Sequence, residues 1–170
     1  MQIVNNFYAE LQKINDSVFE PLQLSIIEFE KEKESQNYNA SKFKINNKTI
    51  FYRLAKKTPK KTGQFVTIWK RNKEGVTKAY NEFDYFDYLI IAVEKESNFG
   101  FFIFPKLILL KNTILATDNI VGKRGIRVYP SWELAINKQA QKTQKWQAEY
   151  FVEIAEYKID FAKFEFIFSP

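Results

Sequence analysis

Apolar residues near the start of the chain recur every three or four positions, which is the period of one face of a helix. The members of this face are Phe7, Leu11, Ile14 and Val18. The pattern predicts an amphipathic helix that ends before Pro21. A second helix is expected from Leu24 to Glu34, where apolar positions give way to alternating Glu and Lys. Its polar side would carry Glu28, Glu30, Glu32 and Glu34.

The pattern then changes to a period of two, which is typical of strands. Apolar residues alternate on both sides of Asn46-Asn47-Lys48, from Phe43 to Leu54. We interpret this stretch as a hairpin, because Asn tolerates the positive φ that a tight hairpin turn requires. A third strand, rich in β-branched and aromatic residues, is expected from Gln64 to Arg71, after a turn from Thr58 to Gly63.

Two unbroken apolar runs follow, Asp87–Glu94 and Phe99–Pro105, joined by a short polar segment. They predict a second hairpin. Because continuous hydrophobicity is typical of strands covered on both faces, we expect this hairpin at the centre of the sheet.

The last third of the chain contains both the helical and the strand spacing of apolar residues. Pro105 suits the first turn of a short helix over Lys106–Leu110, and Ile126–Tyr129 resembles a strand. From Glu133 to Glu156 there is no Pro or Gly, and one face repeats at helical spacing, so a long helix is expected. Alternating phenylalanines then indicate a terminal strand; they are Phe164, Phe166 and Phe168.

Together these elements predict an α/β protein of the α+β type, with a central mixed β-sheet flanked by helices. We expect one domain over residues 1–170, because no repeat or Pro/Gly-rich linker interrupts the chain. The apolar runs are shorter than the roughly 20 residues of a membrane helix, and Met1–Glu10 lacks the features of a signal peptide. A cytoplasmic protein without membrane insertion is therefore expected.

The composition restricts the chemistry. The chain has no Cys and no His, which excludes disulfides, thiolate nucleophiles and the usual zinc ligands. Any metal would be a hard cation such as Mg²⁺ held by carboxylates. We expect no metal site and no cofactor.

Positive charge is concentrated in two segments. Residues 56–78 hold eight Lys or Arg residues against Glu74 alone, and residues 111–146 hold seven against Asp118 and Glu133. Residues 1–34 are acidic instead, with three Lys against seven acids. Two interpretations stay open for the basic segments, namely solvated strand edges and a surface that binds phosphates.

Three ordered strings resemble the MepB family. They are Tyr52–Arg71, Asn98–Lys106 and Gly122–Pro130 continuing into Gln139–Gln147. The resemblance spans essentially the whole chain. The family takes its name from a bacterial operon that also encodes a multidrug efflux transporter and its repressor, so the resemblance implies a fold and a genetic neighbourhood rather than a reaction.

The resemblance also implies a restriction-endonuclease-like core, in which a strand carries an acid-x-Lys signature beside a magnesium site. Lys57 would be the catalytic lysine, but Ala55 stands where the acid should be. No acid occurs from Gln36 to Phe51 either, so the nuclease site looks degraded. Under the alternative of a divergent Mg²⁺-dependent nuclease, the acids would be Glu32 and Glu34.

Our first functional hypothesis is therefore a domain that binds DNA, RNA or another polyanion on a degraded nuclease-like scaffold. A protein that binds small molecules, linked to the drug-efflux operon, is a third possibility. The oligomeric state stays open. The candidate ligand-binding residues are Lys56, Lys61, Gln64, Trp69, Lys70, Arg71, Lys123, Arg124, Arg127, Gln141 and Gln144.

Each of these residues also has a structural interpretation. The lysines would be a solvated turn, Trp69 a half-buried core residue, and the glutamines good helix formers. Under the binding hypothesis, we expect a cleft that combines members of both basic segments with a wall from the Gln141–Gln144 part of the long helix. The members are Lys61, Trp69, Arg71, Arg124 and Arg127. Replacing Arg124 and Arg127 with Ala would then weaken binding and leave stability nearly unchanged.

Overall fold

The computed structural model describes residues 6–169. The helical elements are α1 (Ala9–Ile14), a π-helical turn (Asn15–Phe19), α2 (Lys106–Lys111), α3 (Lys138–Gln147) and α4 (Phe161–Ile167), with short 3₁₀ turns at Gln36–Tyr38 and Ala148–Tyr150. The strands are β1 (Ile27–Lys31), β2 (Ser41–Ile45), β3 (Lys48–Leu54), β4 (Lys56–Thr58), β5 (Lys61–Thr67), β6 (Trp69–Arg71), β7 (Thr77–Ala79), β8 (Tyr88–Lys95), β9 (Asn98–Pro105), β10 (Gly125–Val128) and β11 (Phe151–Glu153). Met1–Asn5, the first half of the segment considered for a signal peptide, lie outside the described residues.

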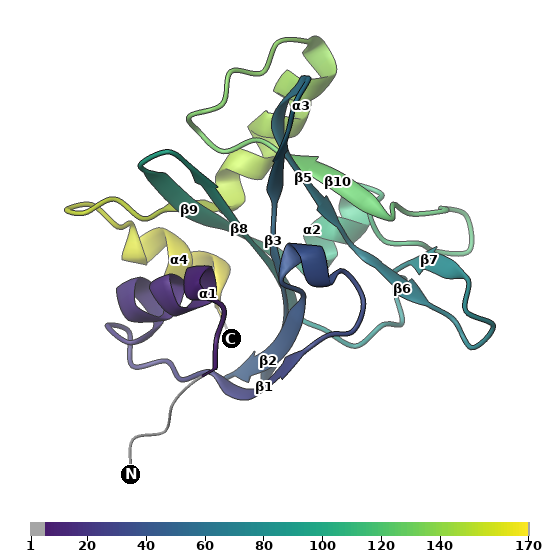
Figure 1. Ribbon diagram of the computed structural model, residues 1–170, viewed down its shortest axis with the longest axis horizontal. Helices are drawn as coiled ribbons and strands as arrows, with labels where there is room; N and C mark the ends of the chain where they lie inside the picture. Colours follow the sequence, from purple (N-terminus) through teal and green to yellow (C-terminus); the bar gives the residue numbers. More distant parts are fainter. Residues whose placement is uncertain (1–5, 170) are drawn as a thin grey trace.

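A mixed six-stranded sheet in the order β1-β2-β3-β8-β9-β11 forms the centre of the fold (Figure 1). Its antiparallel hairpins β2–β3 and β8–β9 flank one parallel pair, β3–β8. Asn46 and Asn47 have φ values of 49° and 64° in the turn between β2 and β3. Both predicted hairpins, the central position of β8, the short helix after Pro105 and the strand at Ile126 are confirmed.

Alternate residues of β3, β8 and β9 enter two separate cores, one on each face of this sheet. On the first face Ile90 and Phe101 pack against the helices α1 and α4, through Leu11 and Phe164. On the second face the strands meet α2, the C-terminal part of α3 and a smaller sheet. The molecule is thus a three-layered α+β structure with the central sheet in the middle.

The smaller sheet has the order β10-β5-β4, and β6 pairs with β7 as a separate ribbon. The predicted strand Gln64–Arg71 is therefore two strands in two sheets. The break falls at Ile68, which is buried and donates its N–H to the carbonyl of Arg124. The strand also begins earlier than predicted, at Lys61, so the turn from β4 to β5 is shorter than the expected segment Thr58–Gly63.

The helix predicted over Leu24–Glu34 is wrong, because this segment contains the edge strand β1. A β-bulge interrupts its pairing with β2, and Glu28 within it has a φ of 54°. The bulge brings Ile26 and Phe29, three residues apart, against the same core. That spacing is also the spacing of a helix face, which explains the error.

Two predictions near the C-terminus are also wrong. The helix expected over Glu133–Glu156 covers only Lys138–Gln147, where the side chain of Asn137 caps its start by accepting from the N–H of Ala140. After it Phe151 begins β11, which pairs with β9. The expected terminal strand is the helix α4, in which Phe164 is buried and stacks on Phe168 while Phe166 is 85% exposed.

No helix of the described part of the chain is long and apolar enough to cross a membrane.

Candidate polyanion-binding surface

Strand pairing brings the two basic segments together. Strand β10 lies antiparallel to β5, with Arg127 opposite Phe65 and Gly125 opposite Thr67. Ile126 and Val128 point into the second core, so Gly125 and Arg127 face the opposite side. The Lys60-Lys61 end of the β4–β5 hairpin therefore lies on the same sheet as Lys123–Arg127.

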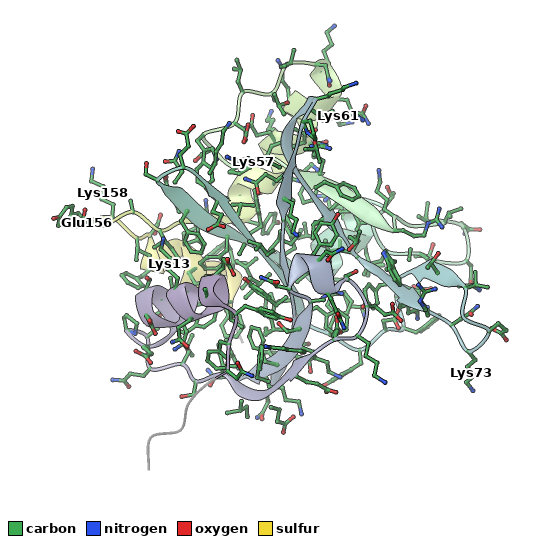
Figure 2. The ribbon with its side chains drawn as sticks, in the orientation of Figure 1. Lys13, Lys57, Lys61, Lys73, Glu156 and Lys158 are labelled. Atoms are coloured by element: carbon green, nitrogen blue, oxygen red, sulfur yellow. The ribbon has the colours of Figure 1, made fainter. Side chains whose placement is uncertain are left out.

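A hollow of about 600 Å³ opens between β5, β10 and α3, and we call it the β5–α3 pocket. Four cations line it, Lys60, Lys61, Lys123 and Arg127, and its lining contains no Asp or Glu. The remaining lining residues are Thr62, Phe65, Asn112, Ile114, Gly125, Ile126, Tyr129, Ile136, Asn137, Gln139, Ala140, Thr143, Trp146 and Gln147. Figure 2 shows Lys61 at the outer end of the hairpin.

Arg127 is the most firmly held cation of this pocket. Its Nη1 donates to the carbonyls of Thr62 and Gly63, at 3.2 and 3.4 Å. The Nε and Nη2 groups have no hydrogen-bond partner among the described residues, which leaves donors for a ligand. Arg127 therefore fixes the hairpin as well as contributing charge, so its removal would not test binding alone.

Helix α3 forms the wall of the pocket because Gln147 attaches it to the free edge of β10. The buried amide of Gln147 donates to the carbonyl of Arg127 at 3.0 Å and accepts from the N–H of Tyr129 at 2.9 Å. These two hydrogen bonds replace those that a neighbouring strand would form with the edge of β10. The preceding residue, Trp146, is half-buried against Phe104, with 5.3 Å between the ring centroids, and its remaining surface lines the pocket.

Three other predicted cations line a second hollow, of about 710 Å³, between the β6–β7 ribbon and the segment 121–124; they are Lys70, Arg71 and Arg124, and we call it the β6–β7 hollow. Its cations are Lys70, Arg71, Lys73, Lys78 and Arg124, again without an acid in the lining. Two of them are paired with carboxylates next to the hollow. Lys70 lies 2.7 Å from Asp84, and Arg71 lies 3.2 Å from Glu34.

The predicted single cleft is thus divided. Lys61 and Arg127 share the β5–α3 pocket, whereas Arg71 and Arg124 line the β6–β7 hollow. Trp69 borders a third, smaller hollow beside Ser35 and Tyr38, and the guanidinium of Arg71 lies 5.0 Å from the centroid of the Trp69 ring.

The three predicted glutamines donate hydrogen bonds to backbone carbonyls and line neither basic hollow. Gln64 is buried and donates to the carbonyl of Glu94 at 2.9 Å. Gln144 donates to the carbonyls of Pro130 and Glu133, and Gln141 to that of Ala135. The α3 residues that line the pocket are Gln139, Ala140, Thr143, Trp146 and Gln147.

The remaining predicted lysines lie on β4. Lys56 is exposed and its Nζ is 5.7 Å from the centroid of the Tyr38 ring, while Lys57 is exposed on the neighbouring position. Neither lines one of the two basic hollows.

The two candidate acids are engaged in ion pairs. Glu32 lies 2.8 Å from Nη1 of Arg53, a residue of β3 whose side chain has no solvent exposure. Glu34 pairs with Arg71. Within residues 6–169, no group of three or more acids gathers in a way that could hold a metal ion. Ala55, at the position of the missing acid, is buried.

Arg53 is the important residue that sequence reasoning missed. Besides Glu32, it donates to the carbonyls of Tyr52 and Thr67 and to the hydroxyl of Tyr80. Burial raises the pKa of Tyr80, although the neighbouring Arg53 opposes that shift. The signal was present, because an arginine within the apolar run Ile50–Ala55 requires a buried counter-charge.

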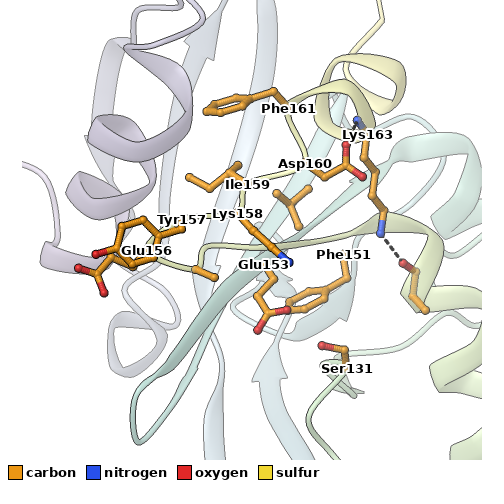
Figure 3. Close-up of a pocket in the computed structure, with 13 residues that line it drawn as sticks. Ser131, Phe151, Glu153, Glu156, Tyr157, Lys158, Ile159, Asp160, Phe161 and Lys163 are labelled. Carbon is orange, nitrogen blue, oxygen red and sulfur yellow. Dashed lines mark hydrogen bonds between the residues drawn. The ribbon is translucent and has the colours of Figure 1, made fainter.

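A further hollow, of about 920 Å³, lies between β11 and the start of α4 (Figure 3). Its charges are mixed, with Lys158 and Lys163 beside Glu153, Glu156 and Asp160. Lys163 donates to the carbonyl of Ala148 at 2.9 Å, and burial lowers its pKa. A hollow with this balance of charges does not favour a polyanion.

Comparison with known proteins identifies the family. The model of the MepB-like family matches residues 32–153, which include β2 to β11 but not β1. The chain belongs to the MepB-like family. This MepB-like protein is also 36% identical to the protein in a crystal structure of MepB, with a TM-score of 0.77. That likeness covers 88% of this chain and 99% of the other.

A search of curated proteins found no match. Both basic hollows of this MepB-like protein are built from residues inside the matched range, whereas α1 and α4 lie outside it. The comparisons support the family and the mixed α+β fold, and the restriction-endonuclease-like core stays a prediction.

Proposed function

We propose that this MepB-like protein binds nucleic acid, or a polyanion of similar charge, through the β5–α3 pocket. One observation carries the proposal. Four cations from two segments more than 60 residues apart line a single hollow that has no acid in its lining. Cations pooled in a concave site focus a positive field, whereas scattered surface lysines are screened from one another beyond about 8 Å.

The pocket also offers contacts that suit a nucleotide. Arg127 has donors left for a phosphate, in a position fixed by its bonds to the hairpin. Trp146 presents part of its indole ring, on which a base could stack.

The geometry favours binding over cleavage. A magnesium-dependent nuclease needs carboxylates that converge on the metal, and both candidate acids are already paired with arginines. Small-molecule binding has no specific support either, because the hollow between β11 and α4 is lined by five charged side chains of both signs beside its three aromatic residues.

Fluorescence anisotropy with labelled DNA, RNA and heparin at low salt tests the proposal. The informative variant is Lys61→Ala combined with Lys123→Ala, since both lysines are exposed and neither forms an ion pair among the described residues. We expect roughly tenfold weaker binding, because two phosphate contacts are lost. Stability should change by no more than about 0.5 kcal/mol.

The matched control is Lys42→Ala combined with Lys158→Ala, which removes the same charge elsewhere. Both residues are exposed, and Figure 2 shows Lys158 far from Lys61. The control should bind like the wild type. If both double variants weaken binding equally, the loss of affinity depends only on net charge, and the assignment of the pocket as the binding site is overturned.

A further inference from the structure

The segment from Gly122 to Arg127 separates the β5–α3 pocket from the β6–β7 hollow and contributes to both. Lys123, Gly125 and Arg127 line the pocket, whereas Gly122 and Arg124 line the hollow. Neighbouring residues of one short segment therefore face two basic concavities. At about 3.3 Å per residue, Arg124 and Arg127 are only about 10 Å apart along the chain.

Two residues of the segment between the two concavities are glycines packed against their neighbours. A Cβ on Gly122, whose φ is +76°, would lie 2.7 Å from the amide nitrogen of Ala116. A Cβ on Gly125 would lie 2.5 Å from the ring of Phe65. Neither position can carry a side chain, because atoms of neighbouring residues already fill the space that a Cβ would take.

The β6–β7 hollow retains positive charge after its internal pairs are counted. Lys70 and Arg71 are compensated by carboxylates, but Lys73, Lys78 and Arg124 have none within 4 Å among the described residues. Arg124 instead contacts the hydroxyl of Thr77 at 3.3 Å. Figure 2 shows Lys73 at the tip of the ribbon, on the other side of the β10 region from Lys61.

We propose that the two concavities form one continuous track that binds a single strand of nucleic acid in preference to a duplex. This inference rests on the proposed function and extends it to a second subsite. A flexible strand can follow two hollows that share one short, basic segment and place bases against a half-buried indole. A duplex is a stiff rod that holds its bases stacked inside, so it can reach only the rim lysines.

The test compares oligonucleotide lengths. A strand of about 4 nucleotides fits one concavity, whereas a strand of about 16 nucleotides spans both. Because the second contact is then intramolecular, the longer strand should bind at least about tenfold more tightly than the shorter one. The probes are DNA strands and RNA strands of both lengths and a duplex. Comparing their affinities shows which kind of nucleic acid supplies the phosphates that the protein binds.

The decisive variant is Lys73→Ala combined with Lys78→Ala, which changes only the β6–β7 hollow. It should lower affinity for the long strand to near that of the short one and leave duplex binding nearly unchanged. The double change of Lys42 and Lys158 to Ala again serves as the control.

The inference is overturned if this variant binds the long strand like the wild type, or if duplex binds as tightly as single strand. In both cases the effect of the Lys61 and Lys123 substitutions would remain, and the β5–α3 pocket alone would be the site. Absence of binding to every nucleic acid at low salt would remove the proposed function as well.

Discussion

At the residue scale, the ion pair between Arg53 and Glu32 is the contact with the largest expected effect on stability. Arg53 is fully buried, whereas the side chain of Glu32 keeps 22% of its exposure. Glu32→Gln keeps the shape of the side chain and leaves the buried guanidinium without a counter-charge. We expect this variant to lose about 3 kcal/mol in the free energy of unfolding, measured by urea denaturation.

Glu30→Gln is the control for this prediction, because Glu30 is exposed on the same strand. It should change stability by less than about 0.5 kcal/mol. If both variants unfold at the same urea concentration, the ion pair is not a structural contact and Glu32 becomes free for the nuclease alternative.

Tyr52 is a second residue with a measurable effect. Its side chain is fully buried on β3, and its hydroxyl has no hydrogen-bond partner among the described residues. An unpaired buried hydroxyl is costly, so Tyr52→Phe should stabilise the protein by about 1 kcal/mol at pH 7. Urea denaturation measures the difference.

The advantage of Tyr52→Phe should grow at alkaline pH. Burial, and then the nearby Glu10 and Glu94, raise the pKa of Tyr52 well above its ordinary value of 10.0. Above about pH 10 the unfolded chain ionises this tyrosine and the folded chain does not, so stability falls as pH rises toward the folded pKa. An advantage that stays constant from pH 7 to about pH 11 would contradict this explanation.

At the element scale, α4 distinguishes the observed structure from the one that the sequence suggested. In a strand, Phe164, Phe166 and Phe168 would share one face. In the helix Phe164 is buried and Phe166 is 85% exposed. Phe164→Ala should therefore lose about 3–5 kcal/mol of stability, and Phe166→Ala less than about 0.5 kcal/mol. Similar losses for both variants would indicate that the three rings share a face after all.

The elements that could be predicted are those with a local cause. Asn46 and Asn47 fix the first hairpin, and the unbroken apolar runs identify β8 and β9. Those that failed depend on distant contacts. The bulge at Glu28 imitates a helix spacing, and β11 exists because Phe151 and Val152 pair with β9 rather than because a breaker ends α3.

The sequence predicts which types of residue form the candidate site, but it does not predict which of these residues lie together in one hollow. Charge alone singled out Lys61, Lys123 and Arg127, and the pairing of β5 with β10 brings them together. Nothing local indicates that the chain breaks at Ile68, which moves Arg71 to another hollow. The side chains of Gln141 and Gln144 do not line the pocket because they donate hydrogen bonds to carbonyls of the loop at 130–135.

At the scale of the whole molecule, the charge distribution is uneven across the central sheet. The basic strands β4, β5 and β10 belong to the layer on one face, whereas four of the seven acids up to residue 34 lie at the edge strand β1 or just after it. Such a separation of charge orients an approaching polyanion and accelerates its association, and both effects weaken with added salt.

The central claim is that cations of the β5–α3 pocket neutralise the phosphates of a bound strand. The most direct measurement is the slope of the logarithm of the binding constant for a single strand against the logarithm of salt concentration. Four neutralised phosphates predict a slope of about −3 for the wild type, and the Lys61→Ala, Lys123→Ala variant should reduce its magnitude by about 1.4. A slope near zero, or a slope unchanged in the variant, would contradict the account.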